Sequence, residues 1–320
     1  MKAIVVSAFG GPDVLKYFGN HEMLKVLGDH QIFIKVSHAG VNPVDTYKRA
    51  GNYQPSSPKP PYTPGSDGAG LVHLCGPKVT KFKPGDRVYF CDFQTGSYAE
   101  YCTVSEDRAY RLHDNLSFEQ GAAIGFHTSL PTVLSLLKEK LEKAKRFLFT
   151  EPVEGSAWPA ARLPSTSASK SLAQLALKKA RWNGASEVLN HREDGYMELL
   201  KKGQPIDVII EMLANVNLQK DLDLIAEEGV IVIVGSRDRA EILPRSIMMK
   251  ESLVTAVSLF RCTHETWKEM GDFFDRGQRD GWVRPVIGKV YKLHEANLAH
   301  EEVIKHQAGS QGKILLSIDD

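Results

Sequence analysis

The strongest constraint on the fold is a pair of apolar runs joined by a helical segment. IDVIIEML (206–213) and VIVIVGS (230–236) are almost continuously apolar, as is typical of strands buried on both faces of a parallel sheet. Between them, LQKDLDLIAEEG (218–229) has helical spacing, and Gly229 is of the type that follows a helix end. SLVTAVSLF (252–260) is a third apolar run. This alternation predicts a doubly wound α/β sheet.

The first third of the chain has a different texture. Residues 1–124 contain short apolar runs separated by turns such as the Pro-Gly pair at 64–65, which is typical of a mostly β, barrel-like domain. GKILLSI (312–318) predicts a last strand, which we expect to return to this domain. We therefore predict one domain from 1–124 together with 265–320, and an α/β domain from 125–264.

Composition and charge argue against several classes of function. The 320 residues are 42% hydrophobic and 25% charged, as in ordinary globular proteins. The net charge of +1 gives no global field that would favour nucleic acid or a membrane surface. No apolar run is long enough to span a bilayer, and the N-terminus lacks the features of a signal or transit peptide. We expect a cytoplasmic protein that does not bind membranes.

The reactive residue types point away from metal and nucleophile chemistry. Cys75, Cys91, Cys102 and Cys262 are scattered and form no C-x-x-C pair, so we expect reduced thiols and no metal site. The chain also has no G-x-S-x-G motif and no Cys/His pair with the spacing of a known family. Any chemistry is therefore expected to come from a bound cofactor.

Ligands of a parallel sheet bind just beyond the carboxyl ends of its strands. This rule points to 211–217, 235–237 and 259–260, which follow the three apolar runs. Gly235 allows a ligand to approach the backbone closely. The guanidinium of Arg237 suits a phosphate, although an ordinary solvated arginine explains this residue equally well.

Two turn-rich segments of the β-type domain carry polar side chains of interest. AGVNPVDTYKRAGNY (39–53) contains Asn42, Tyr47 and Tyr53, and PYTPGSDGAG (61–70) contains Ser66 and Asp67. Without further information, the first segment is explained by an Asn-Pro turn with surface tyrosines, and the second by a barrel corner.

These segments resemble the quinone oxidoreductase group, of zeta-crystallin type, among the zinc-free medium-chain dehydrogenases/reductases. The resemblance covers nearly the whole chain except 126–182. It is carried by FGGPDVLK, IKVSHAGVNPVDTYKRAGNY, PYTPGSDGAG, FKPGDRV, GSYAEY, QGAAIG, NGASEVLNHRE, IDVIIEMLANVNLQKDL, VIVIVGSR, KES and GWVRPVIG.

The resemblance implies a GroES-like β-barrel-type domain and a Rossmann domain, with NADPH in the cleft between them. In zinc-dependent relatives, a metal-binding His-Glu pair stands where this chain has Ser66 and Asp67. By the resemblance, Asn42, Tyr47 and Tyr53 line the nicotinamide and substrate pocket. It places these residues against the cofactor: Met212, Asn215, Gly235, Ser236, Arg237, Leu259 and Phe260. Relatives assemble as dimers or tetramers, so a homo-oligomer is expected.

The chain departs from the group where a Rossmann site needs glycines after its first strand. The group carries a sequence like VLVHGASGGVGLA there, whereas this chain reads FLFTEPVEGSAWPA (147–160). Only Gly155 remains, Glu151 and Glu154 would set negative charge near a diphosphate, and Pro152 and Pro159 would disrupt the following helix. The first Rossmann strand–helix unit is thus corrupted.

The form of this departure suggests a shifted reading frame. With third bases chosen freely, codons for 126–134 can be read one frame away as IPYFTAYRA, which is the group's sequence at this place. Codons for 147–164 can likewise be read as VLVHGASGGVGLA, then one free position and CQIA. Our hypothesis is that residues from about 126 to a point within 165–181 are translated out of frame, by compensating indels or by an incorrect gene model.

Two classes of function follow. The first is NADPH-dependent reduction of a quinone or an α,β-unsaturated carbonyl, with Asn42, Tyr47 and Tyr53 orienting the acceptor. The second is a non-enzymatic relative, deficient in cofactor binding, that acts as a structural or weakly RNA-binding protein. The near-neutral charge and the absence of an RNA motif disfavour RNA binding.

Overall fold

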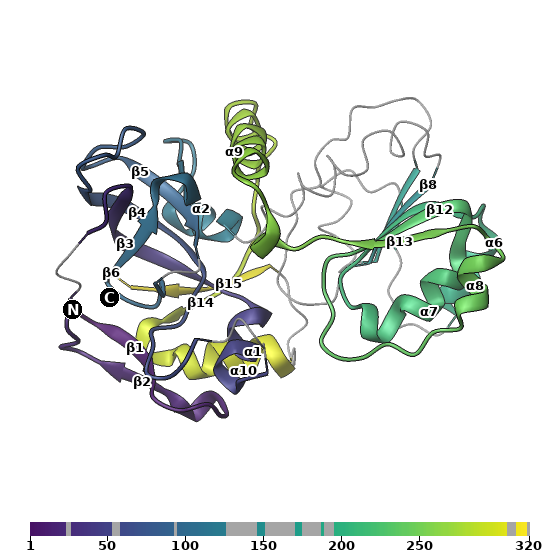
Figure 1. Ribbon diagram of the computed structural model, residues 1–320, viewed down its shortest axis with the longest axis horizontal. Coiled ribbons are helices and arrows are strands. Elements are labelled where there is room, and N and C mark those ends of the chain that lie inside the picture. Colours follow the sequence, from purple (N-terminus) through teal and green to yellow (C-terminus); the bar gives the residue numbers. More distant parts are fainter. Residues whose placement is uncertain are drawn as a thin grey trace. The chain divides into compact units, whose positions relative to one another are not determined.

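The structure, a computed structural model, describes the chain except for residues 24–26, 53–57, 93–94, 126–145, 151–169, 175–186, 189–194, 306–311 and 319–320. Two compact units are formed (Figure 1). The first consists mainly of Met1–Thr128 and Trp267–Asp320, and the second mainly of Ser129–Val153 and Trp158–Thr266.

The first unit is built on a mostly antiparallel sheet. Its strands are β1 (Ala3–Val6), β2 (Leu15–Phe18), β3 (Gln31–Val41), β4 (Asp67–Cys75), β5 (Arg87–Cys91), β6 (Tyr101–Ser105), β7 (Ala109–Arg111), β14 (Ile287–Lys292) and β15 (Lys313–Ser317). The main order is β14-β15-β3-β4-β5-β7, with β6 also pairing with β3, while β1 and β2 form a separate hairpin. The last strand, β15, returns to this unit and pairs antiparallel with β3, as its sequence predicts.

Helices flank this sheet. They are α1 (Pro43–Ala50), α2 (Phe118–Ile124), α9 (His264–Arg279) and α10 (Ala296–Lys305), and the short 3-10 turns are η1 (Pro12–Val14), η2 (Glu106–Arg108) and η5 (Leu293–Glu295). The start of α1 follows directly from its sequence. Asn42 is the N-cap, Pro43 occupies the first helical position, and the Asn42 backbone N–H donates to the Asp45 carboxylate at 3.0 Å. Gly51, at φ 79°, ends the helix in the left-handed region.

The second unit contains a parallel sheet. Its strands are β8 (Arg146–Thr150), β9 (Lys170–Gln174), β10 (Glu187–Val188), β11 (Ile206–Glu211), β12 (Ile225–Ile233) and β13 (Leu253–Ala256), in the order β10-β9-β8-β11-β12-β13. All the pairs of these described strands are parallel. The helices are α6 (Tyr196–Lys202), α7 (Ala214–Leu224) and α8 (Pro244–Met248), with the 3-10 turn η4 (Leu259–Arg261). The doubly wound α/β class predicted for this region is confirmed.

Both faces of β11 are buried, which explains its continuous apolar sequence. Ile209 packs with Leu148 of β8 in one hydrophobic cluster, whereas Val208 and Ile210 point to the opposite face and pack with Val232 of β12. The prediction that this helix ends at Gly229 is wrong. The helix α7 ends at Leu224, and Gly229 lies inside β12, because Ile225 already pairs with β11.

No helix among the described residues combines the length and the apolar character that a membrane crossing requires.

Candidate functional site

Asn42 lies between β3 and α1 with its side chain buried, at 2% exposure. Its amide nitrogen donates to Asp67 at 2.7 Å and to Asp45 at 3.3 Å. Its amide oxygen accepts a hydrogen bond from the Lys313 ammonium. Both amide hydrogens and one lone pair of the oxygen are therefore engaged within the protein.

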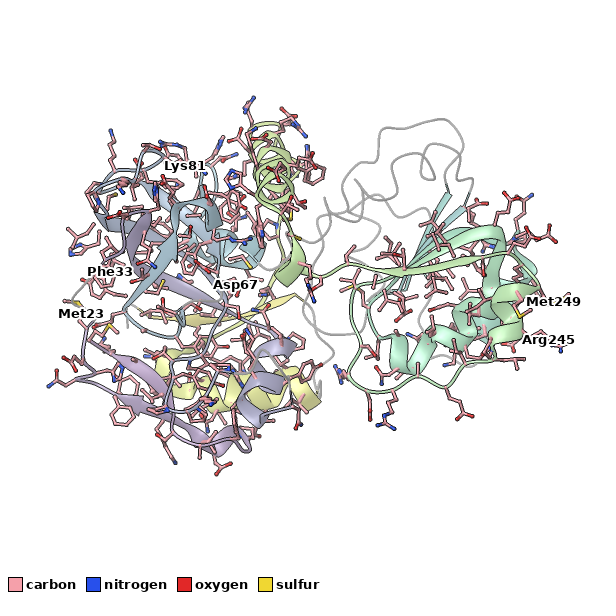
Figure 2. All side chains as sticks on the ribbon, viewed as in Figure 1. Met23, Phe33, Asp67, Lys81, Arg245 and Met249 are labelled. Atoms are coloured by element: carbon pink, nitrogen blue, oxygen red, sulfur yellow. The ribbon has the colours of Figure 1, made fainter. Side chains whose placement is uncertain are left out.

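Lys313 and Asp67 form a buried ion pair beside Asn42. The Lys313 ammonium lies 3.2 Å from the second carboxylate oxygen of Asp67, and the two side chains are 4% and 0% exposed. Asp67, labelled in Figure 2, begins β4, and Lys313 begins β15. Gly40 on β3 leaves room for this carboxylate, because a Cβ at residue 40 would clash with Asp67.

Asp45 connects Asn42 to a second set of buried groups. Its carboxylate accepts from the Ser66 hydroxyl at 2.9 Å, from the Asn42 backbone at 3.0 Å and from the Tyr98 hydroxyl at 3.5 Å. Burial raises the pKa of Asp45, the Asp67 charge raises it further, and Lys48 acts in the opposite direction. The Asn42, Ser66 and Tyr98 groups that contact this carboxylate all donate to it.

A buried histidine continues the chain of hydrogen bonds. Tyr98 lies 3.1 Å from Nε2 of His300, and Arg49 lies 3.1 Å from Nδ1 of His300. Burial, together with the charge of Arg49, lowers the pKa of His300 to about 3, so the ring is neutral at neutral pH. Because Arg49 can only donate, Nδ1 is the acceptor and Nε2 carries the hydrogen.

Asp45 and Ser66 also line a cavity of about 580 Å³ in the first unit. This volume falls within the range of about 300–1,000 Å³ typical of small-molecule sites. Other described residues of its wall include Lys48, Tyr62, Thr63 and Tyr101. Burial raises the pKa of Tyr62 to about 12, so its hydroxyl stays protonated.

Tyr47 and Tyr53 are the other two residues of this unit that were predicted to line the acceptor pocket. Tyr47 is half-buried on α1 and, among the described residues, does not line the cavity. Tyr53 lies outside the described residues. The Asn42 side chain is therefore hydrogen-bonded to Asp45, Asp67 and Lys313. Among the described residues, it is not grouped with the predicted tyrosines.

In the second unit, the predicted cofactor residues gather at the carboxyl ends of β11 and β12. The Asn215 side-chain oxygen accepts from the Arg237 backbone at 3.0 Å, and the Ala214 backbone N–H donates to Gly235 at 3.0 Å. A Cβ at Gly235 would clash with the carbonyl oxygen of Met212, so a glycine is required there.

The remaining predicted cofactor residues lie nearby or are only partly described. Ser236 follows Gly235 and donates its hydroxyl to the Asp238 carbonyl at 2.9 Å. Leu259 lies after β13 in η4 and is buried, whereas of Phe260 only the backbone is described. The segment 151–160, where the phosphate loop is expected, lies outside the described residues.

Glu211 braces this edge of the sheet. It is fully buried, and it accepts hydrogen bonds from the Thr150 hydroxyl, the Leu213 backbone and, at 3.3 Å, the Asn217 amide. Burial and the neighbouring Glu211 carboxylate raise the pKa of Asp221 well above its ordinary value. Glu211 thus ties the ends of β8 and β11 to the start of α7.

Comparison with known proteins identifies the family. The profile of the alcohol dehydrogenase GroES-like domain matches residues 28–114, and that of the zinc-binding dehydrogenases matches 183–316. Quinone oxidoreductases of Sus scrofa and Homo sapiens are 41% and 40% identical, over 99% of this chain and 97% of each relative. The chain belongs to the quinone oxidoreductase family of the medium-chain dehydrogenases/reductases.

A solved relative of this quinone oxidoreductase family has the same fold. The Escherichia coli quinone oxidoreductase complexed with NADPH superposes with a TM-score of 0.84 at 27% identity, covering 99% of this chain and 100% of that one. The fold class, a GroES-like domain and a Rossmann sheet, is thereby confirmed.

The second profile is named for zinc-binding dehydrogenases, so the described residues were compared with the ligand set of a metal site. Among the described residues, no group of three or more His, Cys, Asp or Glu side chains could hold a metal ion. Burial raises the pKa of the Cys91 thiol well above its ordinary value, and the charges of Asp67 and Asp92 add to this effect.

Sequence reasoning singled out Asn42 and Asp67 separately, but it missed the contact between them and the partners Asp45 and Lys313. Lys313 is separated from Asn42 by 271 residues, and no local motif connects the two. Asp45 carried one local signal, since it stands three residues after an N-cap asparagine, as in a capping box. His300 carried none, because its partners Arg49 and Tyr98 lie on distant segments.

Proposed function

We propose that this quinone oxidoreductase family member reduces a quinone or an α,β-unsaturated carbonyl compound with NADPH. The observation that carries the proposal is the full-length similarity to quinone oxidoreductases. The E. coli relative complexed with NADPH supports the choice of cofactor. We place the catalytic, GroES-like domain at 1–124 with 265–320 and the cofactor domain at 125–264.

We propose that described residues of the second unit hold part of the dinucleotide. Gly235 packs directly against the Met212 carbonyl at the carboxyl ends of β11 and β12, where a Cβ would clash. Met212, Asn215, Gly235, Ser236 and Arg237, with Leu259 and Phe260 after β13, would hold the cofactor. The Asn215 side-chain oxygen accepts from the Arg237 backbone N–H, which ties α7 to the loop after β12.

When bound, NADPH supplies the hydride. The protein's contribution is to orient the acceptor and to exclude water. We propose that the acceptor binds near Asn42, Tyr47 and Tyr53, beside the cavity that Asp45 and Ser66 line. This mostly apolar cavity, with a few convergent polar groups, suits a planar quinone.

Turnover of the purified chain tests the proposal. NADPH is titrated against the protein, and its oxidation is then followed by absorbance with menadione as the acceptor. Saturable binding together with menadione-dependent oxidation is the expected result. No binding at millimolar NADPH contradicts the enzymatic function for this chain and favours the structural or RNA-binding alternative, which filter binding of an AU-rich RNA then examines.

We also propose that the protein self-associates as a dimer or tetramer and acts in the cytoplasm. The edge strand β13 exposes Leu253, and α8 exposes Met248, with Met249 directly after it; these side chains are 55%, 74% and 73% exposed (Figure 2 labels Met249). Exposed apolar patches mark association surfaces. Light scattering should show that Leu253→Asp lowers the molar mass, whereas Leu74→Asp, at an exposed leucine of the first unit, does not.

A further inference from the structure

The cluster around Asn42 has the chemistry of a rigid frame. The Lys313 ammonium can only donate hydrogen bonds, and the carboxylates of Asp67 and Asp45 can only accept them. A flipped Asn42 amide would point its hydrogens at the ammonium and its oxygen at two carboxylates. The charges around this amide therefore fix it in a single orientation.

The frame is separate from the wall that a ligand would touch. Among the described residues, Asp45 and Ser66 line the cavity, whereas Asn42, Asp67 and Lys313 do not. Asn42 nevertheless holds Asp45 at two points, through its backbone N–H at 3.0 Å and its side-chain amide at 3.3 Å. The position of the Asp45 carboxylate thus depends on an amide that Lys313 and Asp67 hold from the other side.

We propose that Asn42, Asp67 and Lys313 are positioning residues of the acceptor site, which hold the Asp45 carboxylate and the Ser66 hydroxyl at the cavity wall. The proposal rests on the proposed function and changes the part played by Asn42, which supports the wall rather than contacting the acceptor. The last strand of the chain thereby acts on a site built mainly from the first hundred residues.

A buried ion pair is not needed for stability alone. Neutral replacement of such a pair often leaves stability unchanged, whereas removing one partner leaves a buried charge uncompensated and costs about 3–5 kcal/mol. The informative variant is therefore the neutral pair Asp67→Asn/Lys313→Met, which removes both charges and nearly keeps the side-chain volumes. It separates a positioning role from a purely structural one.

The test is a double-mutant cycle between Asn42→Ala and the neutral pair. We expect each to lower kcat/KM for menadione by about 10- to 100-fold, as misplacement of a site by roughly 1 Å does. Combining them should add little, because both disrupt the same frame. The affinity for NADPH and the melting temperature should stay near those of the wild type for the neutral pair, and Lys289→Met, at an exposed lysine of β14, is the control.

Three outcomes would contradict the positioning role, and a fourth would contradict only the proposed function. A folded neutral-pair variant with wild-type kcat and KM would show that the ion pair is only structural. Losses that multiply in the combined variant would show that Asn42 meets the acceptor independently. If the wild type does not oxidise NADPH, the proposed function fails, and the same cycle measured on menadione affinity by fluorescence quenching still decides the positioning role. Absence of menadione binding to the wild type overturns it as well.

Discussion

At the scale of single residues, His300 makes stability depend on pH. Its pKa is about 3 in the folded protein, below the ordinary value of 6.5, so the unfolded chain binds the additional proton between these values. The contribution of the neutral His300 to the free energy of unfolding is complete above pH 6.5. It is lost as the pH falls below 6.5, by about 1.4 kcal/mol per pH unit at most. Urea unfolding between pH 7.5 and 5 should show a smaller loss for His300→Gln than for the wild type; equal losses contradict the prediction.

Gly235 is a second residue whose identity is set by its neighbours. Gly235→Ala drives a methyl group into the Met212 carbonyl, and forcing the two strand ends apart should cost about 1–3 kcal/mol. We expect a weaker affinity for NADPH in calorimetry together with a lower melting temperature. Gly19→Ala is the control, because nothing lies within 4 Å of a Cβ at that position. A Gly235→Ala protein that matches this control would refute the requirement for glycine.

At the scale of elements, Glu211 links two strands to a helix. Glu211→Ala removes the acceptor of the Leu213 N–H, whereas the Thr150 hydroxyl keeps the Ile210 carbonyl as an acceptor at 3.1 Å. A donor left without a partner costs about 1–3 kcal/mol. Urea unfolding should show a loss of at least this size. The exposed Glu227 of β12 gives the control Glu227→Ala, which should change stability by less than about 0.5 kcal/mol. Equal losses in the two variants would exclude a bracing role for Glu211.

Elements were more predictable from sequence than their ends and their partners. The apolar run of β11 predicted a doubly buried strand, because burial on both faces removes the alternation of polar residues. The end of α7 was predicted wrongly, since helical spacing continued to Gly229 while pairing with β11 drew Ile225 into β12. The Asn-Pro turn drew attention to Asn42 in the sequence. No sequence pattern indicated Lys313, because only tertiary folding brings β15 beside β3.

At the scale of the whole molecule, the segment 147–160 decides how the chain can bind its cofactor. The relatives align over 99% of the chain, yet 147–160 lacks the glycine-rich sequence that the resemblance to the group implies there. β8 includes the first residues of this segment, ends at Thr150 and pairs in parallel with β9 and β11. In a Rossmann sheet the pyrophosphate is bound after such a strand. An altered sequence there is therefore expected to change the affinity for the cofactor rather than the folding of the GroES-like unit.

The reading-frame hypothesis makes a sharp prediction. A version of the chain in which 147–159 is replaced by VLVHGASGGVGLA should bind NADPH at least about tenfold more tightly, since the glycines admit the pyrophosphate to a helix N-terminus. Calorimetry measures this, and Gly155→Ala in the original chain should change little if no functional loop exists there. Sequencing of the transcript, with mass spectrometry of peptides from the native protein, examines the origin directly. Peptides containing EPVEGSAW would establish a genuinely divergent protein and contradict the frame shift.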